Sequence, residues 1–188
     1  MYELLKKYIQ ANVTATPDQL NEIVSSFRAK KVKRNSILLS AGEICKELYF
    51  VNKGSIRTYY ISRQGKERTR YLAPDGMICT SLNSFISQKP SFEHVDAIEN
   101  SELLSISHTN FYKMIDGVEE WSKFYRLLLE SAYSHQNERI ENLVMLTANE
   151  RYADIMQNHP EYVRRLPNHI LASYLDMSQE TLSRLKSK

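Results

Sequence analysis

The chain has 188 residues, of which 42% are hydrophobic, so it can bury a real core as one large or two small domains. Its formal net charge of +3 neither requires nor excludes nucleic acid, because the placement of charge matters more than its sum. It has no run of about 18 apolar residues, no apolar signal core in MYELLKKYIQ, and two cysteines, Cys45 and Cys79, far apart; these features predict a reduced, cytoplasmic protein without a membrane span.

The first segment, residues 1–30, is predicted to be mostly helical. Its first apolar stripe consists of Leu4, Leu5, Tyr8 and Ile9. Thr16 is predicted to cap a second helix, with Pro17 at the first helical position, where its missing N–H costs nothing. We interpret both helices as packing elements without a functional role.

Residues 31–107 alternate short β-type runs with turn residues. The expected strands are SILL at 36–39, ELYFV at 47–51, SIRTYYI at 55–61, RTRYL at 68–72 and ELLSI at 102–106. Glycine-containing breaks separate them, and glycine supplies the positive φ that tight corners need. Strands at this spacing predict an antiparallel sandwich or barrel, and with the flanking helices an α+β protein.

The stretch AGEICKELYFVNKGSIRTYYISRQGKERTRYLAPDGMI resembles the cyclic-nucleotide-binding β-roll of the CRP/FNR family of bacterial transcription regulators. The matching pieces are Gly42-Glu43, Leu48-Tyr49-Phe50-Val51, Gly54-Ser55, Gly65-Lys66-Glu67 and Gly76. The resemblance implies an effector domain over residues 1–118, made of the N-terminal helices and the β-roll.

The ligand-binding positions of that family are changed here. Members that bind cyclic AMP use a Gly-Glu-Leu stretch, an Arg-Ser pair for the phosphate and a hydroxyl pair on the long helix. The aligned residues are Cys79-Thr80-Ser81, Ser91-Phe92 and Gln136-Asn137. A buried phosphate needs a bidentate cation, so we expect no response to cyclic AMP.

Two interpretations of the roll therefore stay open. It either mainly supports a dimer, or it binds another small molecule of unknown identity in a pocket formed by Thr80, Ser81, Ser91, Phe92, Gln136 and Asn137. No cofactor is expected. Haem ligation by Cys79 and His94, as in another branch of the family, is a minor alternative, and an iron–sulfur cluster needs more cysteines than two.

Residues 119–146 show the longest helical periodicity. A helix of about 25 residues spans about 40 Å, more than a small domain needs, and one apolar seam suits a two-stranded coiled coil. The resemblance implies the same role, a dimer axis. The expected interface residues are Trp121, Phe124, Tyr125, Leu128, Ala132 and His135.

Residues 147–188 are predicted to form a small helical domain. Thr147 and Glu150 fit a capping box that starts a helix after a hinge. Further on, LPNHILASYLDMSQETLSRLKSK predicts two short helices, with Leu171 and Leu175 on one apolar stripe, and with Asp176 and Ser178 providing the break and the next cap. An exposed face with Glu and Arg suits the major groove, although any packed helix pair with a charged face fits the pattern.

LASYLDMSQETLSRLK is similar to the helix-turn-helix of CRP/FNR regulators, in which Ser178, Glu180, Thr181 and Arg184 match the front of the recognition helix. We expect Arg184 and Glu180 to read bases, while Gln179 replaces a residue that is often Arg. The expected DNA-binding residues are Gln179, Glu180, Thr181, Ser183, Arg184, Lys186, Lys188 and His169. Because the sequence stops at Lys188, we expect none of the β-hairpin wing that often follows in the family.

These patterns predict a homodimeric, cytoplasmic, sequence-specific transcription regulator whose partners are double-stranded DNA, a second copy and, by resemblance, RNA polymerase. An enzyme is not expected, because the sequence has no nucleophile elbow, no Gly-rich phosphate loop and no HExxH motif. The alternative is a signalling module that binds a cyclic nucleotide or another small ligand without sequence-specific DNA binding.

Overall fold

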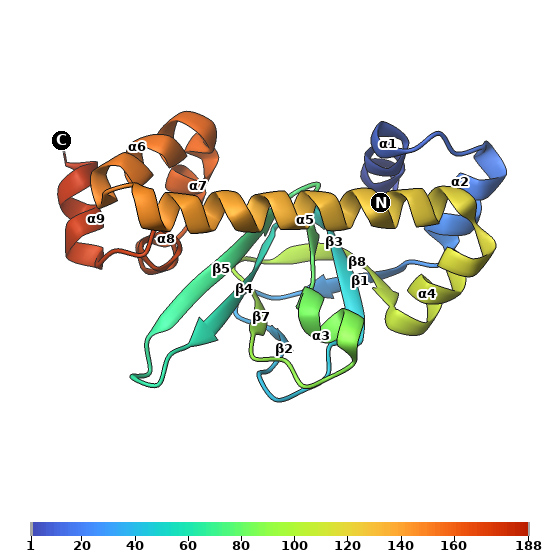
Figure 1. Cartoon of the computed structure of the whole chain (residues 1–188), viewed down its shortest axis with the longest axis horizontal. Coiled ribbons are helices and arrows are strands. Elements are labelled where there is room, and N and C mark those ends of the chain that lie inside the picture. Colours follow the sequence, from blue (N-terminus) through green and yellow to red (C-terminus); the bar gives the residue numbers. More distant parts are fainter. Residues whose placement is uncertain (1, 188) are drawn as a thin grey trace. The chain divides into compact units, whose positions relative to one another are not determined.

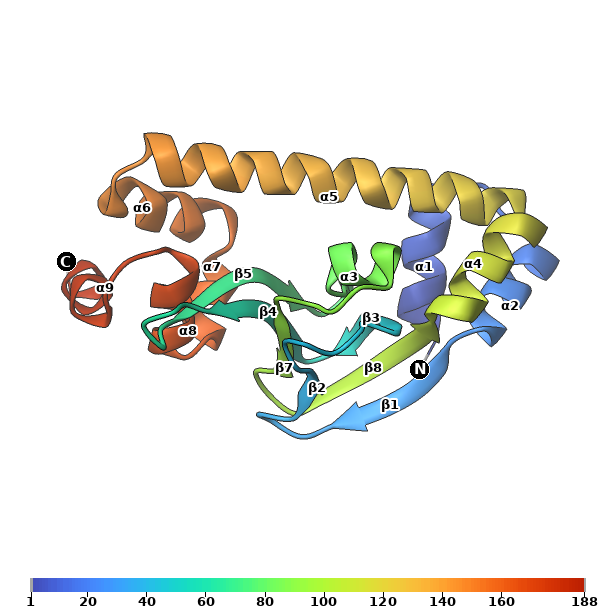
Figure 2. The same cartoon turned by 60° about the horizontal axis from the view of Figure 1, so that its bottom comes forward.

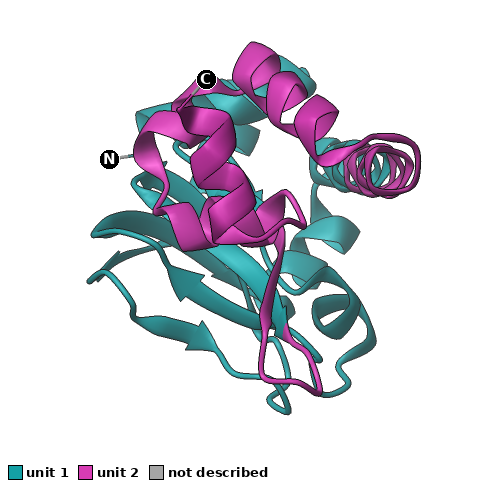
Figure 3. Ribbon diagram, turned by 90° about the vertical axis from the view of Figure 1, so that its left-hand side faces the viewer, with its two compact units in different colours: residues 1–60, 71–130 teal, residues 61–70, 131–188 magenta. Residues whose placement is uncertain are grey.

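The computed structural model describes residues 2–187, and the chain divides into two compact units (Figure 3). The first unit comprises Met1–Tyr60 and Tyr71–Glu130, and the second comprises Ile61–Arg70 and Ser131–Lys188. The second unit therefore joins a hairpin tip from the strand region to the C-terminal helices, a grouping that no sequence pattern indicates.

The strands form two four-stranded sheets (Figures 1 and 2). One sheet has the order β1 (Arg28–Val32), β8 (Ser101–Ser107), β3 (Glu47–Lys53), β6 (Ile78–Cys79). The other has the order β2 (Ile37–Leu39), β7 (His94–Ala97), β4 (Ser55–Ile61), β5 (Glu67–Pro74). β8 pairs antiparallel with β1 and with β3, and β7 pairs antiparallel with β2 and with β4, so the predicted α+β class with antiparallel strands is confirmed.

All five predicted strands are present, but three others were missed. Residues 28–30, expected to be helical, begin β1, whose first four residues are exposed and show no alternation of apolar and polar side chains. This strand forms because its backbone pairs with β8, not because of its own side-chain pattern. β6 and β7 contain only two and four residues, too short for a recognisable period.

The helices of the first unit are α1 (Glu3–Asn12), α2 (Pro17–Ser25), α3 (Leu82–Ser87), α4 (His108–Gly117) and the start of α5 (Glu119–Met145). Thr16 caps α2, because its side chain accepts a hydrogen bond from the backbone N–H of Gln19 and Gln19 bonds back to Thr16. Of the predicted α1 stripe, Leu5 and Ile9 are buried, but Leu4 is 37% exposed and does not belong to the core.

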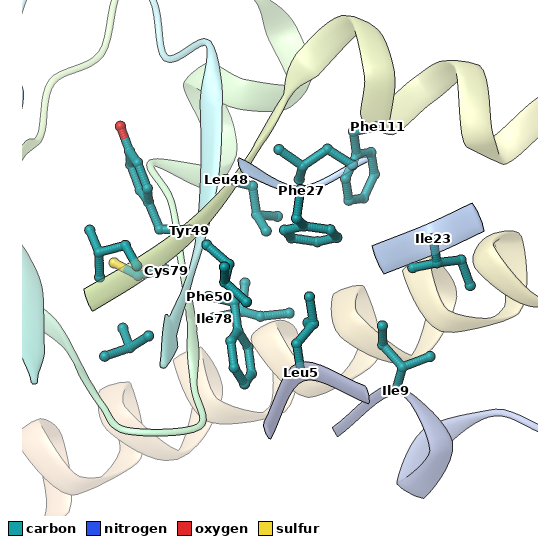
Figure 4. Close-up of a cluster of buried hydrophobic side chains, with 14 of the residues drawn as sticks. Leu5, Ile9, Ile23, Phe27, Leu48, Tyr49, Phe50, Ile78, Cys79 and Phe111 are labelled. Carbon is teal, nitrogen blue, oxygen red and sulfur yellow. The ribbon is translucent and has the colours of Figure 1, made fainter. Parts of the chain in front are cut away.

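The core of the first unit lies between the N-terminal helices, the sheets and the start of α5 (Figure 4). Leu5, Ile9 and Ile23 from the helices and Phe50 from β3 belong to this core, and all four are fully buried. Gly54 illustrates why glycine is needed at one corner. It has φ +107°, and a Cβ at this position would collide with Ser101.

The helices of the second unit are the end of α5, then α6 (Ala148–Asn158), α7 (Pro160–Arg165), α8 (Asn168–Tyr174) and α9 (Gln179–Lys186). The predicted capping box of α6 is confirmed, since Thr147 Oγ1 accepts from the Glu150 N–H and the Glu150 carboxylate accepts from the Thr147 N–H. α7, for which no element was predicted from the sequence, begins with Pro160 at its first helical position. No helix within residues 2–187 has the length and apolar character that crossing a bilayer demands.

Candidate nucleic-acid interface

The helix pair α8–α9 is joined by a tight turn at Asp176. Asp176 adopts the left-handed conformation with φ +50°, as its side-chain type allows, and the Met177 N–H bonds to the Ala172 carbonyl at 3.0 Å. The Ser178 hydroxyl then caps α9 by accepting from the Thr181 N–H at 3.1 Å. The predicted turn at Asp176 and the predicted cap at Ser178 are therefore both confirmed.

The back of α9 packs against α8. Leu171, Ala172, Leu175 and Leu182 are buried, and Leu185 is half-buried. A small side chain at Ala172 permits the close crossing of the two helices. Because the apolar side of α9 is occupied by α8, the opposite side of the helix is left at the surface.

The outer face of α9 carries Gln179, Glu180, Ser183 and Arg184, all exposed. A hydrogen bond from Ser178 and one from the backbone N–H of Glu180 lower the pKa of the Glu180 carboxyl, so this group stays ionised. Arg184 Nη2 lies 3.4 Å from Thr181 Oγ1, which is half-buried. The face therefore presents an anionic acceptor one turn from a forked cationic donor.

The remaining predicted DNA contacts differ in their surroundings. His169 is exposed in the first turn of α8. Lys186 Nζ donates to Asn168 Oδ1 at 2.7 Å and to the Val163 carbonyl at 3.4 Å, so it ties the end of α9 to α7 and α8. Lys186 thus has a structural role that was not predicted. Lys188 lies outside the described residues.

Two arginines hold the helix-turn-helix and were missed by the sequence reasoning. Arg151 donates to the carbonyls of Leu146, Leu175 and Asp176, at 2.6, 2.8 and 3.2 Å. Arg139 donates to the Tyr174 carbonyl at 2.8 Å and lies 4.3 Å from the centroid of the Tyr174 ring. Burial lowers the pKa of the Arg139 guanidinium. An arginine in a helix gives no signal in the sequence that its target is a distant carbonyl.

Two of the predicted effector residues in the first unit, Ser81 and Ser91, form a hydrogen bond with each other. The hydroxyls of Ser81 and Ser91 are 2.9 Å apart, and both side chains are buried. Ser91 Oγ also donates to the Glu93 carbonyl and accepts from the Glu93 N–H, each at 2.9 Å. These two serines align with or beside the family's ribose- and phosphate-binding positions. Their hydroxyls thus already have hydrogen-bond partners within the protein.

Within the first unit, Thr80 and Phe92 do not join this pair. Thr80 Oγ1 donates to the Glu47 carbonyl at 3.0 Å and lies 3.2 Å from Cys45 Sγ. Phe92 is 82% exposed, so its side chain does not line an enclosed cavity in this structure. Gln136 and Asn137 belong to the second unit, where Gln136 Oε1 accepts from Arg70 at 2.9 Å.

A buried ion pair in β4 and β7 was also missed. Arg57 binds Asp96 through two hydrogen bonds, from Nε to Oδ1 at 2.9 Å and from Nη2 to Oδ2 at 3.0 Å. Its guanidinium carbon lies 4.1 Å from the Tyr59 ring centroid. Arg57 is a buried bidentate cation of the kind that a cyclic phosphate needs, but Asp96 already occupies it.

The predicted dimer seam needs correction. Trp121 and Phe124 are fully buried in the core of the first unit, and Trp121 Nε1 donates to the Phe111 carbonyl at 3.1 Å. Tyr125 and Leu128 are partly buried against the same core. Trp121 and Phe124 are thus covered within their own chain, whereas Tyr125 and Leu128 keep part of their surface exposed. Ala132 and His135, in the second unit, are half-buried.

A different stripe of α5 is apolar and exposed. Tyr133 is 70% exposed, Ile140 50% and Val144 75%. Leu129, Tyr133, Gln136, Ile140 and Leu143 follow the alternating spacing of four and three residues that a coiled-coil seam requires. This stripe lies roughly a quarter of a turn around the helix from the buried one.

Within residues 2–187, no three His, Cys, Asp or Glu side chains gather to hold a metal ion.

Residues 29–117 match the family model of the cyclic nucleotide-binding domain. The chain is 25% identical over 181 residues to the anaerobic regulatory protein of Pasteurella multocida, covering 89% of this chain and 64% of that protein. The fumarate and nitrate reduction regulatory protein of Escherichia coli K12 is also 25% identical over 181 residues, with 89% and 70% covered. Over most of its length, this chain is therefore similar to regulatory proteins of the FNR type. It spans less than two thirds of the length of the Pasteurella protein.

Solved structures have the same fold. FixK2 from Bradyrhizobium japonicum aligns with a TM-score of 0.74 and 17% identity, over 86% of this chain and 83% of that one. A putative CRP/FNR-family transcriptional regulator from Eubacterium rectale aligns with a TM-score of 0.72 and 20% identity, over 91% and 82%. The predicted resemblance to CRP/FNR regulators, with a β-roll and C-terminal helices, is therefore confirmed.

Proposed function

We propose that this CRP/FNR relative is a homodimeric, sequence-specific DNA-binding transcription regulator that does not respond to cyclic AMP. The observation that carries the proposal is the α8–turn–α9 pair, whose back is buried and whose front presents Glu180 and Arg184. The relatives described above are named as regulatory proteins, which favours regulation over catalysis.

Base readout follows from the chemistry of the α9 face. Arg184 can bind the O6 and N7 of a guanine through its fork, and the ionised Glu180 can accept from the N4 of a cytosine. Thr181, Ser183, Lys186 and Lys188 contact backbone phosphates. Such contacts fix the register of the protein on the duplex without reading the base sequence. In a two-fold dimer, two α9 helices read a near-palindrome whose half-sites lie about one helical turn apart.

Selection of binding sites from random duplexes tests this function. We expect one near-palindrome to be enriched, and Arg184→Ala to bind it about 1–3 kcal/mol more weakly while losing preference at one base pair per half-site. His169→Ala, which removes a phosphate-edge contact on α8, is the matched control and should leave base preference unchanged. Enrichment of no sequence, or an Arg184→Ala variant that binds as the parent does, would contradict the assignment of α9 as the reader.

The lack of response to cyclic AMP is proposed from the closed serine pair. A cyclic phosphate beside Ser81 and Ser91 would be a buried charge without a cation, which costs several kcal/mol. That cost removes micromolar affinity, so calorimetry should detect no binding of cyclic AMP or cyclic GMP below millimolar concentration. Saturable micromolar binding would contradict the proposal, and Ser91→Arg alone should not create it, because the ribose and base contacts are also absent.

A second copy of the chain is the proposed partner of the exposed α5 stripe. Exposed apolar side chains at the a and d spacing favour a parallel pair of α5 helices about a two-fold axis. Gln136 would be the single polar residue of this seam, a position that commonly fixes register. Contact with RNA polymerase, implied by the resemblance to CRP/FNR regulators, belongs to the same proposal.

A further inference from the structure

The tip of the β4–β5 hairpin, residues 61–70, is basic and belongs to the same compact unit as α8 and α9 (Figures 2 and 3). Arg63, Lys66 and Arg68 are exposed there against one exposed carboxylate, Glu67. Among the residues that the structure describes, no carboxylate forms an ion pair with Arg63 or Lys66. The tip therefore offers cationic charge at its surface.

The hairpin is anchored to the helices by hydrogen bonds. β5 is an edge strand, so its outward backbone groups need partners outside the sheet. Ser173 of α8 accepts from the Thr69 N–H at 2.7 Å and donates to the Glu67 carbonyl at 3.1 Å. Arg139 donates to the Thr69 carbonyl at 2.9 Å. Side chains of α8 and α5 thus complete the edge of β5 and fix the hairpin beside α8.

The anchoring brings the hairpin to the start of α9. Arg68 forms an ion pair with Asp176, the turn residue two positions before the Ser178 cap of α9. In helix-turn-helix proteins, the N-terminal residues of the recognition helix approach the base edges. Arg68 therefore lies at the turn that leads into α9, and Lys66 and Arg63 follow it toward the tip of the same hairpin.

We propose that the hairpin tip is a second DNA-contacting arm, in which Arg63 and Lys66 bind backbone phosphates next to the bases that α9 reads. The proposal rests on the proposed DNA-binding function and adds a site to it. Its ligand is the phosphate backbone of double-stranded DNA. The arm strengthens binding to any sequence and does not select bases, because phosphates carry no sequence information.

The test uses the double variant Arg63→Gln/Lys66→Gln of the full chain, titrated with the selected duplex and with a scrambled duplex at several salt concentrations. Each lost phosphate contact lowers the slope of log K against log salt by about 0.9, so a dimer that loses four contacts should show a slope smaller by about 3–4. We expect affinity for both duplexes to fall at least tenfold at about 0.1 M salt, with base preference unchanged. Arg68 is left intact because its bond to Asp176 holds the hairpin.

The control is Lys7→Gln/Lys33→Gln, which removes the same charge from two exposed positions of the first unit. It should leave the salt slope unchanged. If the parent binds no duplex, the proposed function fails and not the arm alone. If the parent binds DNA and the hairpin variant keeps the same affinity and the same salt slope, the hairpin tip does not contact DNA and the proposal is wrong. A hairpin variant that binds DNA normally but loses only transcription by RNA polymerase would make the tip a protein contact and also overturn the proposal.

Discussion

The two halves of α5 have the same helical periodicity but different neighbours. In the first half, Trp121 and Phe124 are buried among aromatic side chains of the first unit, and Trp121 lies 5.1 Å from Phe111 between ring centroids. In the second half, Tyr133 and Ile140 are exposed, while the inward side is polar at His135. Periodicity thus predicts a helix and an apolar stripe, but not whether the same chain or a second copy covers that stripe.

The largest effect is expected from the first half. Trp121→Ala would remove a fully buried ring and its hydrogen bond to Phe111, lowering the free energy of unfolding by about 3–5 kcal/mol. Lys123→Ala, two residues further along at the surface, should change it by less than about 0.5 kcal/mol. Urea denaturation followed by far-ultraviolet circular dichroism measures both, since Trp121 is the sole tryptophan and its fluorescence is lost in the variant. Equal effects of the two changes would contradict this division of α5.

Assembly should respond to the second half. Ile140→Glu would bring two like charges together at the proposed seam and raise the dimer dissociation constant at least 100-fold, about 2.8 kcal/mol. Ser131→Glu adds the same charge on the opposite side of the helix and should leave the dimer intact. Light scattering at micromolar concentration measures the oligomeric state of each variant. A parent protein that is monomeric under these conditions would contradict the proposed dimer seam. Leu128→Glu does not serve as this test, because Leu128 packs against its own core.

A smaller effect is expected at the inward side of the second half. Arg139→Lys keeps the charge but loses the guanidinium that donates to the carbonyls of both Thr69 and Tyr174. We expect a loss of about 1–3 kcal/mol in the stability of the C-terminal helices, because a buried carbonyl loses a charged donor. Hydrogen exchange of α8 amides measures this local stability. Arg126→Lys, at an exposed position, is the control, and equal protection in both variants would show that Arg139 does not hold α8.

The sequence predicted what local rules determine. The capping boxes at Thr16 and Thr147, the Asp176 turn and the buried back of α9 each depend on residues within one or two helical turns. What the sequence did not indicate depends on tertiary pairing. Ser81 meets Ser91, and Arg139 meets the hairpin, across separations of many residues. Trp121 and Ile140 look alike in a periodic pattern, so only the packed structure distinguishes core from surface.

The smallest expected effect is a pH dependence at His135. Burial, and then the positive charge of Arg139, lower the pKa of His135 below its ordinary value of 6.5. Arg70 and His159 act in the same direction, whereas Glu138 opposes them. The folded chain therefore holds His135 neutral at a pH where the unfolded chain already binds a proton, so the free energy of unfolding should fall as pH drops below about 6.5. Denaturation midpoints at about pH 7, 6 and 5 measure this fall. His135→Gln should reduce the fall by the part due to His135, while the exposed His169→Gln should not. A parent and a His135→Gln variant with parallel pH profiles would show that folding does not lower the pKa of His135.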